Sequence, residues 1–340
     1  MPFRLLAAMD DDQRRLDRIL RKALPELPLS ALHRLLRQGK ITVNGHIAAG
    51  ETRINAGQLI EIPELAKNNE KILQKNQLTG DKKPCETPLQ IIFEGEGLLV
   101  LNKKRGIAVH GKESLEEQVL AYLKPVLSPS LSFRPGPLHR LDKPTSGLIV
   151  FSANLKGAQY FSALLRERRI RKCYLAIVDG ILPQEETWED NLFRDRETQK
   201  TFASIRGGKK AITRLKPLAA ANNRTLVLAE IETGFTHQIR AQAAYHGHPL
   251  SGDRKYNGAP FPCKKNAENR GSFGYFLHAW KLELPDPAPL PQYFIAPPAE
   301  EFCLKIMEIF GKEALKIISE NQSTTPLQAR TFGSAGYVVL

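Results

Sequence analysis

The stretch "PLHRLDKPTSGLIVFSAN", residues 137–154, places the carboxylate of Asp142 just before an apolar run that is typical of a buried strand. Prolines before and after this carboxylate favour an extended backbone around it. Because side chains alternate along an extended chain, Arg140 and Asp142 are expected on one side and His139 on the other. Asp142 is therefore predicted to stand at the mouth of an element that continues into the core. For a single aspartate, capping the turn at 145–147 is the commoner role.

Composition limits the class of protein and of partner. The chain has 340 residues, of which 42% are hydrophobic, and its formal net charge is +13. This length predicts one large domain, or a large and a small domain that each have a core. The positive charge favours polyanionic partners, with nucleic acid first among them. An anionic membrane surface and simple solubility are the alternatives.

The cysteines and the apolar runs point to a reduced, soluble protein. The four cysteines are far apart and form neither a C-x-x-C pair nor a cluster with histidines at metal-ligand spacing. No run reaches the roughly 18 apolar residues that a membrane span needs, and the N-terminus does not fit a signal peptide. We therefore expect a cytoplasmic protein without a membrane partner, a metal or an organic cofactor.

Residues 14–62 are predicted to form a small α/β unit of two short helices followed by short strands. Ser30 is the expected N-cap of the second helix, and Gly39 is the residue expected to stop it. Asn44 and Gly45 form a typical tight-turn pair between strands.

Basic side chains are expected on the outward faces of these two helices. They are Arg18, Arg21, Arg34 and Arg37, with Lys40 just beyond the second helix. On charge alone, such a stripe is equally well a solvated helix face. The order of elements, however, resembles the RNA-binding module first known from ribosomal protein S-four. That resemblance implies that these five residues bind RNA.

The rest of the chain divides into a linker, a large domain and a tail. Residues 63–88 are rich in Lys, Asn and Gln and poor in apolar side chains, which predicts a linker. Residues 89–312 alternate strand patterns with helical ones, beginning with a hairpin over 91–111. We expect an α+β domain with a mixed, largely antiparallel sheet and flanking helices, which include a surface helix near its end. A loose tail is expected over 319–340.

Several common catalytic motifs are absent from the sequence. There is no phosphate-binding G-x-x-x-x-G-K-[ST] loop, no G-x-G-x-x-G, no H-E-x-x-H and no G-x-S-x-G. The reaction is therefore expected to run without nucleotide hydrolysis, hydride transfer or zinc.

Five segments together resemble the RluA/RluC family of ribosomal-RNA pseudouridine synthases. They are "IIFEGEGLLVLNKKRGIAVHG" (91–111), "HRLDKPTSG" (139–147), "YLAIVDG" (174–180), "TGFTHQIRAQAAYHGHPLSGDRKYNG" (233–258) and "FLHAWKLELPDP" (276–287). The resemblance covers roughly residues 89–300. It implies the pseudouridine synthase fold and the isomerisation of specific uridines in RNA, most of all in large-subunit ribosomal RNA, without a cofactor.

The resemblance also assigns roles to individual residues. Asp142 is implied to act on the uridine, either as a nucleophile or as a base toward the sugar, and Arg240 is implied to be its cationic partner. Tyr174 is implied to stack on the flipped base and to take the proton that leaves carbon 5, and Ile239 to be an apolar pocket wall. Arg140 is implied to enter the space left by the uridine. From the pattern alone, Tyr174 is more often a core residue, and Arg240 is equally well a basic residue on the surface of a helix.

Two further residues qualify this assignment. His139 is expected at the substrate site, where it holds the loop rather than carrying a proton. The family usually has a basic residue where this chain has Phe235, so one RNA contact is expected to be lost or moved. The basic run over 166–172 is expected to follow RNA phosphates, with solubility as the alternative.

Two other functions are alternatives to a pseudouridine synthase. A non-catalytic RNA-binding or ribosome-assembly factor on the same fold has no need to keep Asp142, Tyr174 and Arg240 together. A hydrolase that uses Asp142 with a histidine is disfavoured, because no second carboxylate or nucleophile stands at a recognisable spacing. We therefore expect an enzyme that acts as a monomer on RNA, with ribosomal RNA as the foremost candidate.

Overall fold

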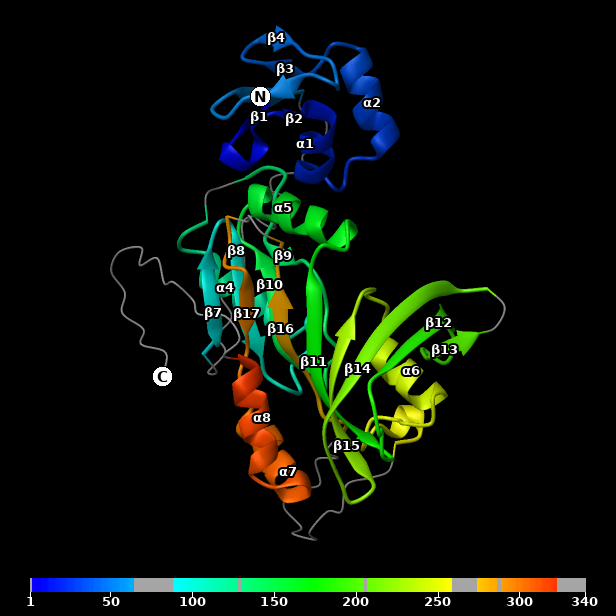
Figure 1. The fold of residues 1–340 in the computed structure, drawn as a ribbon. Helices are drawn as coiled ribbons and strands as arrows, with labels where there is room; N and C mark the ends of the chain where they lie inside the picture. Colours follow the sequence, from blue (N-terminus) through cyan, green and yellow to red (C-terminus); the bar gives the residue numbers. More distant parts are fainter. Residues whose placement is uncertain are drawn as a thin grey trace.

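In the computed structural model, which describes residues 2–63, 88–127, 130–204, 207–258, 274–285 and 289–322, a small module lies against one end of a large sheet domain (Figure 1). The module's helices are η1 (Met9–Asp11), α1 (Leu16–Ala23) and α2 (Leu29–Arg37). Its strands are β1 (Phe3–Leu6), β2 (Arg14–Arg15), β3 (Thr42–Val43), β4 (His46–Ile47), β5 (Arg53–Ile54) and β6 (Leu59–Ile62).

The core of the module follows from the helical spacing of its leucines and isoleucines. Leu16, Ile19 and Leu20 line the inner side of α1 and are fully buried against α2 and the small sheets. Strands β1, β6, β3 and β4 form one sheet, and β2 pairs with β5. Because β1 joins this sheet, the structural unit begins before the predicted boundary at residue 14.

The two ends of α2 test the predicted helix signals. Gly39 follows the helix with a φ of +62°, as expected for a residue that ends a helix in the left-handed region. The predicted N-cap at Ser30 is wrong, because α2 begins at Leu29 and Pro28 occupies the N-cap position. The carbonyl of Pro28 accepts hydrogen bonds from the amides of Ala31 and Leu32, so the helix starts without a side-chain cap.

The described residues of the large domain form an eleven-stranded sheet. Its strands are β7 (Ile91–Gly95), β8 (Leu98–Lys103), β9 (Gly136–Pro137), β10 (Ser146–Ser152), β11 (Arg171–Asp179), β12 (Glu186–Arg194), β13 (Thr201–Ser204), β14 (Lys209–Ala221), β15 (Arg224–Ile231), β16 (Leu277–Glu283) and β17 (Tyr293–Ile295). The main path runs β13-β12-β14-β15-β11-β16-β10-β8-β7, with β17 on β16 and β9 on β10. Among the described strands, β10 and β16 form the one parallel pair. The predicted mixed, largely antiparallel sheet is confirmed.

One glycine allows the central parallel pair to come close together. Gly147 has a φ of +105°, and a Cβ atom built there would lie 2.2 Å from the carbonyl oxygen of Ala279 on β16. A larger residue would therefore push β10 away from β16. Because Gly147 follows the loop of Asp142 directly, this close approach also fixes where that loop leaves the sheet.

Helices cover both faces of the sheet. They are α4 (Leu115–Leu123), α5 (Leu155–Arg166), α6 (Gln238–Tyr245), the short η2 (Arg254–Tyr256), α7 (Glu300–Phe310) and α8 (Glu313–Gln322). Tyr174 and Ile231 belong to the core on one face of the sheet, whereas the adjacent Leu175 belongs to the core on the other face, together with residues of α7 and α8. No helix in the described ranges is long and apolar enough to cross a membrane.

The C-terminal segment differs from the two elements expected there. The predicted surface helix is a pair, α7 and α8, divided at Gly311, whose φ is +83°. Phe302 and Ile306 of α7 are buried against the sheet, so this helix is part of the core packing. Helix α8 runs to Gln322, which makes the expected loose tail wrong at its start, and residues 323–340 lie outside the described residues. The predicted linker also lies outside them, over residues 64–87.

The module contacts the domain through two acidic side chains from η1. Asp10 accepts a hydrogen bond from the amide of Leu155, the first residue of α5, at 2.8 Å. Asp11 is fully buried and accepts hydrogen bonds from the Leu131 amide and from the hydroxyl groups of Ser130 and Ser132. A buried carboxylate with several donors is an arrangement that fixes one surface against another.

Candidate active site

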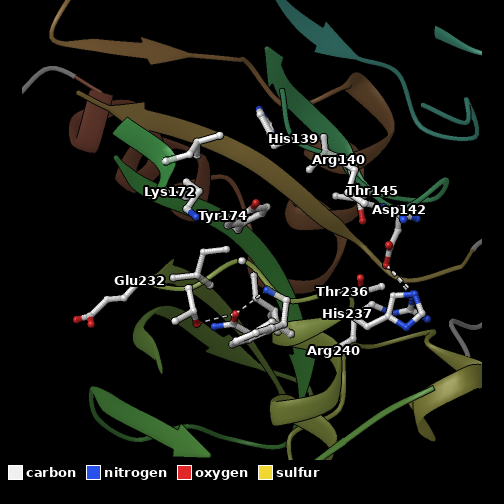
Figure 2. Close-up of a pocket in the computed structure, with 18 of the residues that line it drawn as sticks. His139, Arg140, Asp142, Thr145, Lys172, Tyr174, Glu232, Thr236, His237 and Arg240 are labelled. Carbon is white, nitrogen blue, oxygen red and sulfur yellow. Dashed lines mark hydrogen bonds and ion pairs between the residues drawn. The ribbon is translucent and has the colours of Figure 1, made fainter. Parts of the chain in front are cut away.

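Asp142 lies on the loop between β9 and β10, where the extended segment turns into the core strand. Its main-chain carbonyl closes that turn by accepting a hydrogen bond from the Thr145 amide at 3.0 Å. The carboxylate does not cap the turn and instead points toward α6 (Figure 2). Only 16% of the side chain is exposed. The main chain of Asp142 therefore stabilises the turn, and its carboxylate takes no part in it.

Arg240 of α6 is the nearest cation to this carboxylate. Its Nη1 atom lies 2.8 Å from Asp142 Oδ2, while its Nε and Nη2 atoms donate to the two carboxylate oxygens of Asp253 at 2.6 and 2.9 Å. The guanidinium carbon also lies over the rings of Tyr256 and Tyr275, at 4.9 and 4.4 Å from their centroids. The paired hydrogen bonds to Asp253 and the two aromatic rings therefore hold the guanidinium group of Arg240 in place beside Asp142.

Burial and charge act against each other on Arg240. Burial opposes its positive charge, but the hydrogen bonds to Asp253 and Asp142 outweigh burial and raise the pKa of Arg240. Asp253 is itself only 2% exposed. A buried cation held in this way stabilises the negative charge of a carboxylate that contacts it.

The start of α6 is held by the segment that precedes it. Gln238 is buried, and its side-chain oxygen accepts from the Thr233 hydroxyl at 2.8 Å and from the Phe235 amide at 3.2 Å. His237 stands at the N-cap position with a φ of 60°. These contacts fold the segment 233–237 back on α6, and so they fix the direction in which Arg240 points.

A cavity of about 510 Å³ opens beside Asp142 and is lined by all six residues predicted for the catalytic and substrate sites. Tyr174 of β11, Ile239 of α6 and Asp142 all line it, and Figure 2 shows Tyr174 across the cavity from Asp142. Burial, followed by the negative charge of Asp142, raises the pKa of Tyr174. An apolar wall, a buried aromatic ring and a paired carboxylate therefore face one space large enough for a nucleoside.

The two residues before Asp142 differ in their surroundings. Arg140 is exposed at the rim of the cavity. The His139 ring also lines the cavity, stacks on Phe161, and accepts a hydrogen bond from the Val150 amide through Nε2 at 3.1 Å. Burial, with a smaller effect of Lys172, lowers the pKa of His139 to about 4. His139 therefore holds the loop on β10 as a neutral ring.

The end of the cavity beyond Tyr174 is basic. Arg166, Arg168 and Lys172 line it, and Figure 2 shows Lys172 pointing inward beside Tyr174. Burial and then the charge of Arg168 lower the pKa of Lys172. Phe235, at the position where a basic residue was expected, lines the same cavity.

The basic residues of the module lie outside this cavity. Arg18, Arg21, Arg34, Arg37 and Lys40 are all exposed on or next to α1 and α2. They form a separate surface, and their expected contact with RNA stays a prediction. Within the described residues, no group of three or more His, Cys, Asp or Glu side chains is arranged to hold a metal ion.

Lys103 is a further site residue that the sequence did not single out. It is 1% exposed, and its ammonium group donates to the carbonyls of Lys104, Ile107 and Lys143 at 3.0, 2.8 and 3.2 Å. Burial lowers the pKa of Lys103 to about 8, although the charge of Asp142 acts in the opposite direction. The contact with the Lys143 carbonyl ties the loop of Asp142 to the end of β8.

The chain is similar to two sequence families and to proteins of known name. The family described as RNA pseudouridylate synthase matches residues 97–245, and the S4 domain matches residues 14–60. The chain is 30% identical to ribosomal large subunit pseudouridine synthase C of Vibrio parahaemolyticus, over 82% of this chain and 88% of that protein. It is 32% identical to ribosomal large subunit pseudouridine synthase D of Haemophilus ducreyi, over 83% of this chain and 89% of that protein.

Two solved structures of human RNA pseudouridylate synthase domain proteins have a fold similar to that of this chain. Human RNA pseudouridylate synthase domain containing 1 has a TM-score of 0.54 and 23% identity, and covers 72% of this chain and 98% of its own. Human RNA pseudouridylate synthase domain containing 4 has a TM-score of 0.53 and 22% identity, and covers 64% of this chain and 91% of its own.

Proposed function

The chain belongs to the RNA pseudouridylate synthase family and is therefore an RNA isomerase, and we propose that it converts specific uridines of large-subunit ribosomal RNA to pseudouridine, with Asp142 as the residue that acts on the uridine. The observation that carries this proposal is the ionic contact of 2.8 Å between Asp142 and Arg240 at the wall of a nucleoside-sized cavity.

The choice of RNA rests on relatives and on charge. Both relatives named above are ribosomal large subunit pseudouridine synthases, and they match this chain over more than four fifths of their length. The net charge of +13 and the exposed basic residues of the S4 domain support a large polyanionic substrate. The basic end of the cavity, at Arg168 and Lys172, supports a contact with phosphates beside the target uridine.

The chemistry needs a carboxylate and no source of energy. The bond between the ribose and N1 of uracil is broken, the base turns, and a bond to C5 forms while C5 loses its proton to N1 through the site. No atom is gained or lost, and the carbon–carbon product is the more stable. Asp142 either attacks the sugar carbon or removes a proton from the sugar, and both routes need it ionised beside Arg240.

Tyr174 and Arg140 take supporting roles in this proposal. Tyr174 stacks on the flipped uracil, and its raised pKa keeps its hydroxyl group protonated at neutral pH. Because this hydroxyl group is already protonated, it can accept the C5 proton only while it gives its own proton to another group. Arg140, exposed at the rim of the cavity, fills the gap that the flipped uridine leaves in the RNA stack. This offsets part of the cost of flipping, which is on the order of a few kcal/mol.

Tritium release from large-subunit ribosomal RNA labelled at C5 of uridine tests the proposal. The wild-type protein is expected to release tritium, Asp142→Asn to release none, and both to bind the RNA equally. Asp12→Asn, on the surface of the S4 domain, is the matched control and should release tritium at the wild-type rate. Equal binding with no release by the wild-type protein would instead favour a non-catalytic RNA-binding factor.

A further inference from the structure

Two hydrogen-bond donors and a histidine ring converge on one oxygen of the Asp142 carboxylate. Arg240 Nη1 lies 2.8 Å from Oδ2, the Tyr275 hydroxyl 3.2 Å and His237 Nε2 3.4 Å. Among the residues that the structure describes, every hydrogen bond and ion pair found for this side chain ends on Oδ2. The two carboxylate oxygens therefore stand in different surroundings, with Oδ1 being the one turned away from Arg240.

The hydrogen bonds of Tyr256 favour one of the two neutral forms of the His237 ring. The Tyr256 hydroxyl oxygen accepts a hydrogen bond from the Thr201 amide at 2.8 Å and lies 2.9 Å from His237 Nδ1. Its single hydrogen is then available for Nδ1. When Tyr256 donates to Nδ1, the ring proton lies on Nε2, the nitrogen that faces Asp142.

The opposite arrangement is unfavourable. If Nδ1 carried the proton, the lone pair of Nε2 would face a carboxylate oxygen at 3.4 Å. Burial lowers the pKa of His237 to about 4, although the charge of Asp142 acts against this, so the ring is neutral near pH 7. A neutral ring in the Nε2–H form turns its N–H group toward Asp142 and adds no positive charge.

Tyr275 is directed in a similar way. Its ring is 2% exposed, and its hydroxyl also lies 3.3 Å from the Thr145 hydroxyl. When Thr145 donates to this oxygen, the Tyr275 hydrogen is free for Asp142. Thr145 belongs to the turn that follows Asp142, so the same loop orients both the carboxylate and one of its donors.

We propose that Oδ1 is the oxygen of Asp142 that reacts with the uridine, and that His237, held as the Nε2–H form by Tyr256, is a positioning residue that keeps Oδ2 engaged. This inference rests on the proposed role of Asp142. An oxygen that accepts from Arg240 and Tyr275 and also faces the His237 ring is a weaker nucleophile and base than the other oxygen of the same carboxylate. The donors also stop the carboxylate from rotating, so Oδ1 meets the ribose in one orientation.

Variants at 237 and 256 separate this role from a purely structural one. The side-chain amide of Gln can place its nitrogen near the position of the ring Nε2 and donate to Asp142 without help from Tyr256, whereas Leu cannot. His237→Gln is expected to keep kcat within about threefold of the wild type, and His237→Leu to lower it about tenfold or more with KM unchanged. Rates are measured as tritium release from the labelled ribosomal RNA.

The effect of Tyr256 should depend on the residue at 237. Tyr256→Phe is expected to lower kcat about tenfold beside His237 and to have no further effect beside His237→Gln. Tyr245→Phe, an exposed tyrosine on α6, is the matched control and should change nothing. The proposal is overturned if Gln is as slow as Leu at 237, or if Tyr256→Phe costs the same rate in both backgrounds.

Nitrogen chemical shifts of the histidine rings give a readout that does not depend on activity. In protein labelled with ¹⁵N-histidine, the His237 signals, assigned by their loss in His237→Gln, should show the neutral Nε2–H form at pH 7. Tyr256→Phe should shift them toward a mixture of the two neutral forms. A neutral Nδ1–H ring or a charged ring in the wild type contradicts the inference. Absence of tritium release by the wild type would count against the proposed function alone, since these signals still decide the ring form.

Discussion

Asp142 and Arg240 are 98 positions apart in the sequence, yet Arg240 Nη1 lies 2.8 Å from Asp142 Oδ2. The loop before β10 and the first turn of α6 meet at this contact. Arg240 also donates two hydrogen bonds to the buried Asp253. The geometry at Asp142 therefore depends on three segments of the chain.

Arg240→Lys should separate charge from geometry. A lysine keeps the positive charge but has one nitrogen, so it cannot contact Asp253 in a fork and Asp142 at the same time. We expect kcat for tritium release to fall by about 100-fold or more, and the free energy of unfolding by about 3 kcal/mol, with RNA binding preserved. Arg254→Lys, at an exposed position of η2, is the control. A lysine variant with the wild-type rate would show that charge alone suffices.

The sequence predicted the elements of the fold better than the partners of the site. Two apolar runs on either side of an acidic turn with glycines indicated the β7–β8 hairpin, and the structure has it. The contacts of Asp253 and Tyr256 with Arg240 could not be predicted, because a motif shows which residues occur and not which side chains meet. Tyr275 gave no signal at all, since its role depends on a contact with a loop 133 positions earlier.

Two charged residues were missed for a related reason. Lys103 stands in a basic run that also suits an exposed turn, and Asp11 stands in an acidic run near the N-terminus. Charged residues are mostly exposed, so composition favours the wrong environment for both. Only the tertiary structure shows that each is buried among hydrogen-bonding groups of other segments.

Lys103→Met is expected to affect both stability and rate. The methionine fills the buried space but removes the donor to the Ile107 carbonyl and leaves the Lys143 carbonyl with the Gly106 amide alone. We expect the free energy of unfolding in urea to fall by about 2–4 kcal/mol, and kcat to fall because the loop of Asp142 loses its tie to β8. Lys104→Met, one position later and exposed, should change neither. Equal effects of the two variants would show that burial of Lys103 has no special importance.

Acid should destabilise the protein through its buried histidines. His278 is fully buried, its Nδ1 lies 2.9 Å from the Ser146 hydroxyl, and its Nε2 lies 2.9 Å from the Ala296 carbonyl. Burial lowers the pKa of His278 to about 4, against an opposing effect of the Ala296 hydrogen bond. In the unfolded chain the pKa is about 6.5, so the unfolded state binds more protons between pH 6.5 and pH 4. The stability from the neutral ring is therefore complete above pH 6.5 and is lost as pH falls toward 4.

Urea unfolding at pH 7 and pH 5 measures this effect. The free energy of unfolding should fall by about 2 kcal/mol for each such histidine, at about 1.4 kcal/mol for each pH unit. His278→Gln should reduce the difference between the two pH values, whereas His33→Gln, at an exposed position of α2, should leave it unchanged. An unchanged difference in His278→Gln would mean that His278 does not resist protonation.

Asp11→Asn should loosen the S4 domain from the catalytic domain. The Asp11 carboxylate accepts from the Leu131 amide and from two serine hydroxyls of the catalytic domain, and an amide nitrogen in place of one oxygen would face donors instead of accepting from them. We expect a loss of about 1–3 kcal/mol at this contact, enough to split one calorimetric unfolding transition into two. KM for ribosomal RNA should rise, while the rate at saturating RNA should stay close to that of the wild type.

Asp12→Asn is the matched control, because Asp12 accepts from the Ala56 amide inside the S4 domain and should keep the single transition. Two transitions already present in the wild-type protein would show that the contact through Asp11 does not couple the domains.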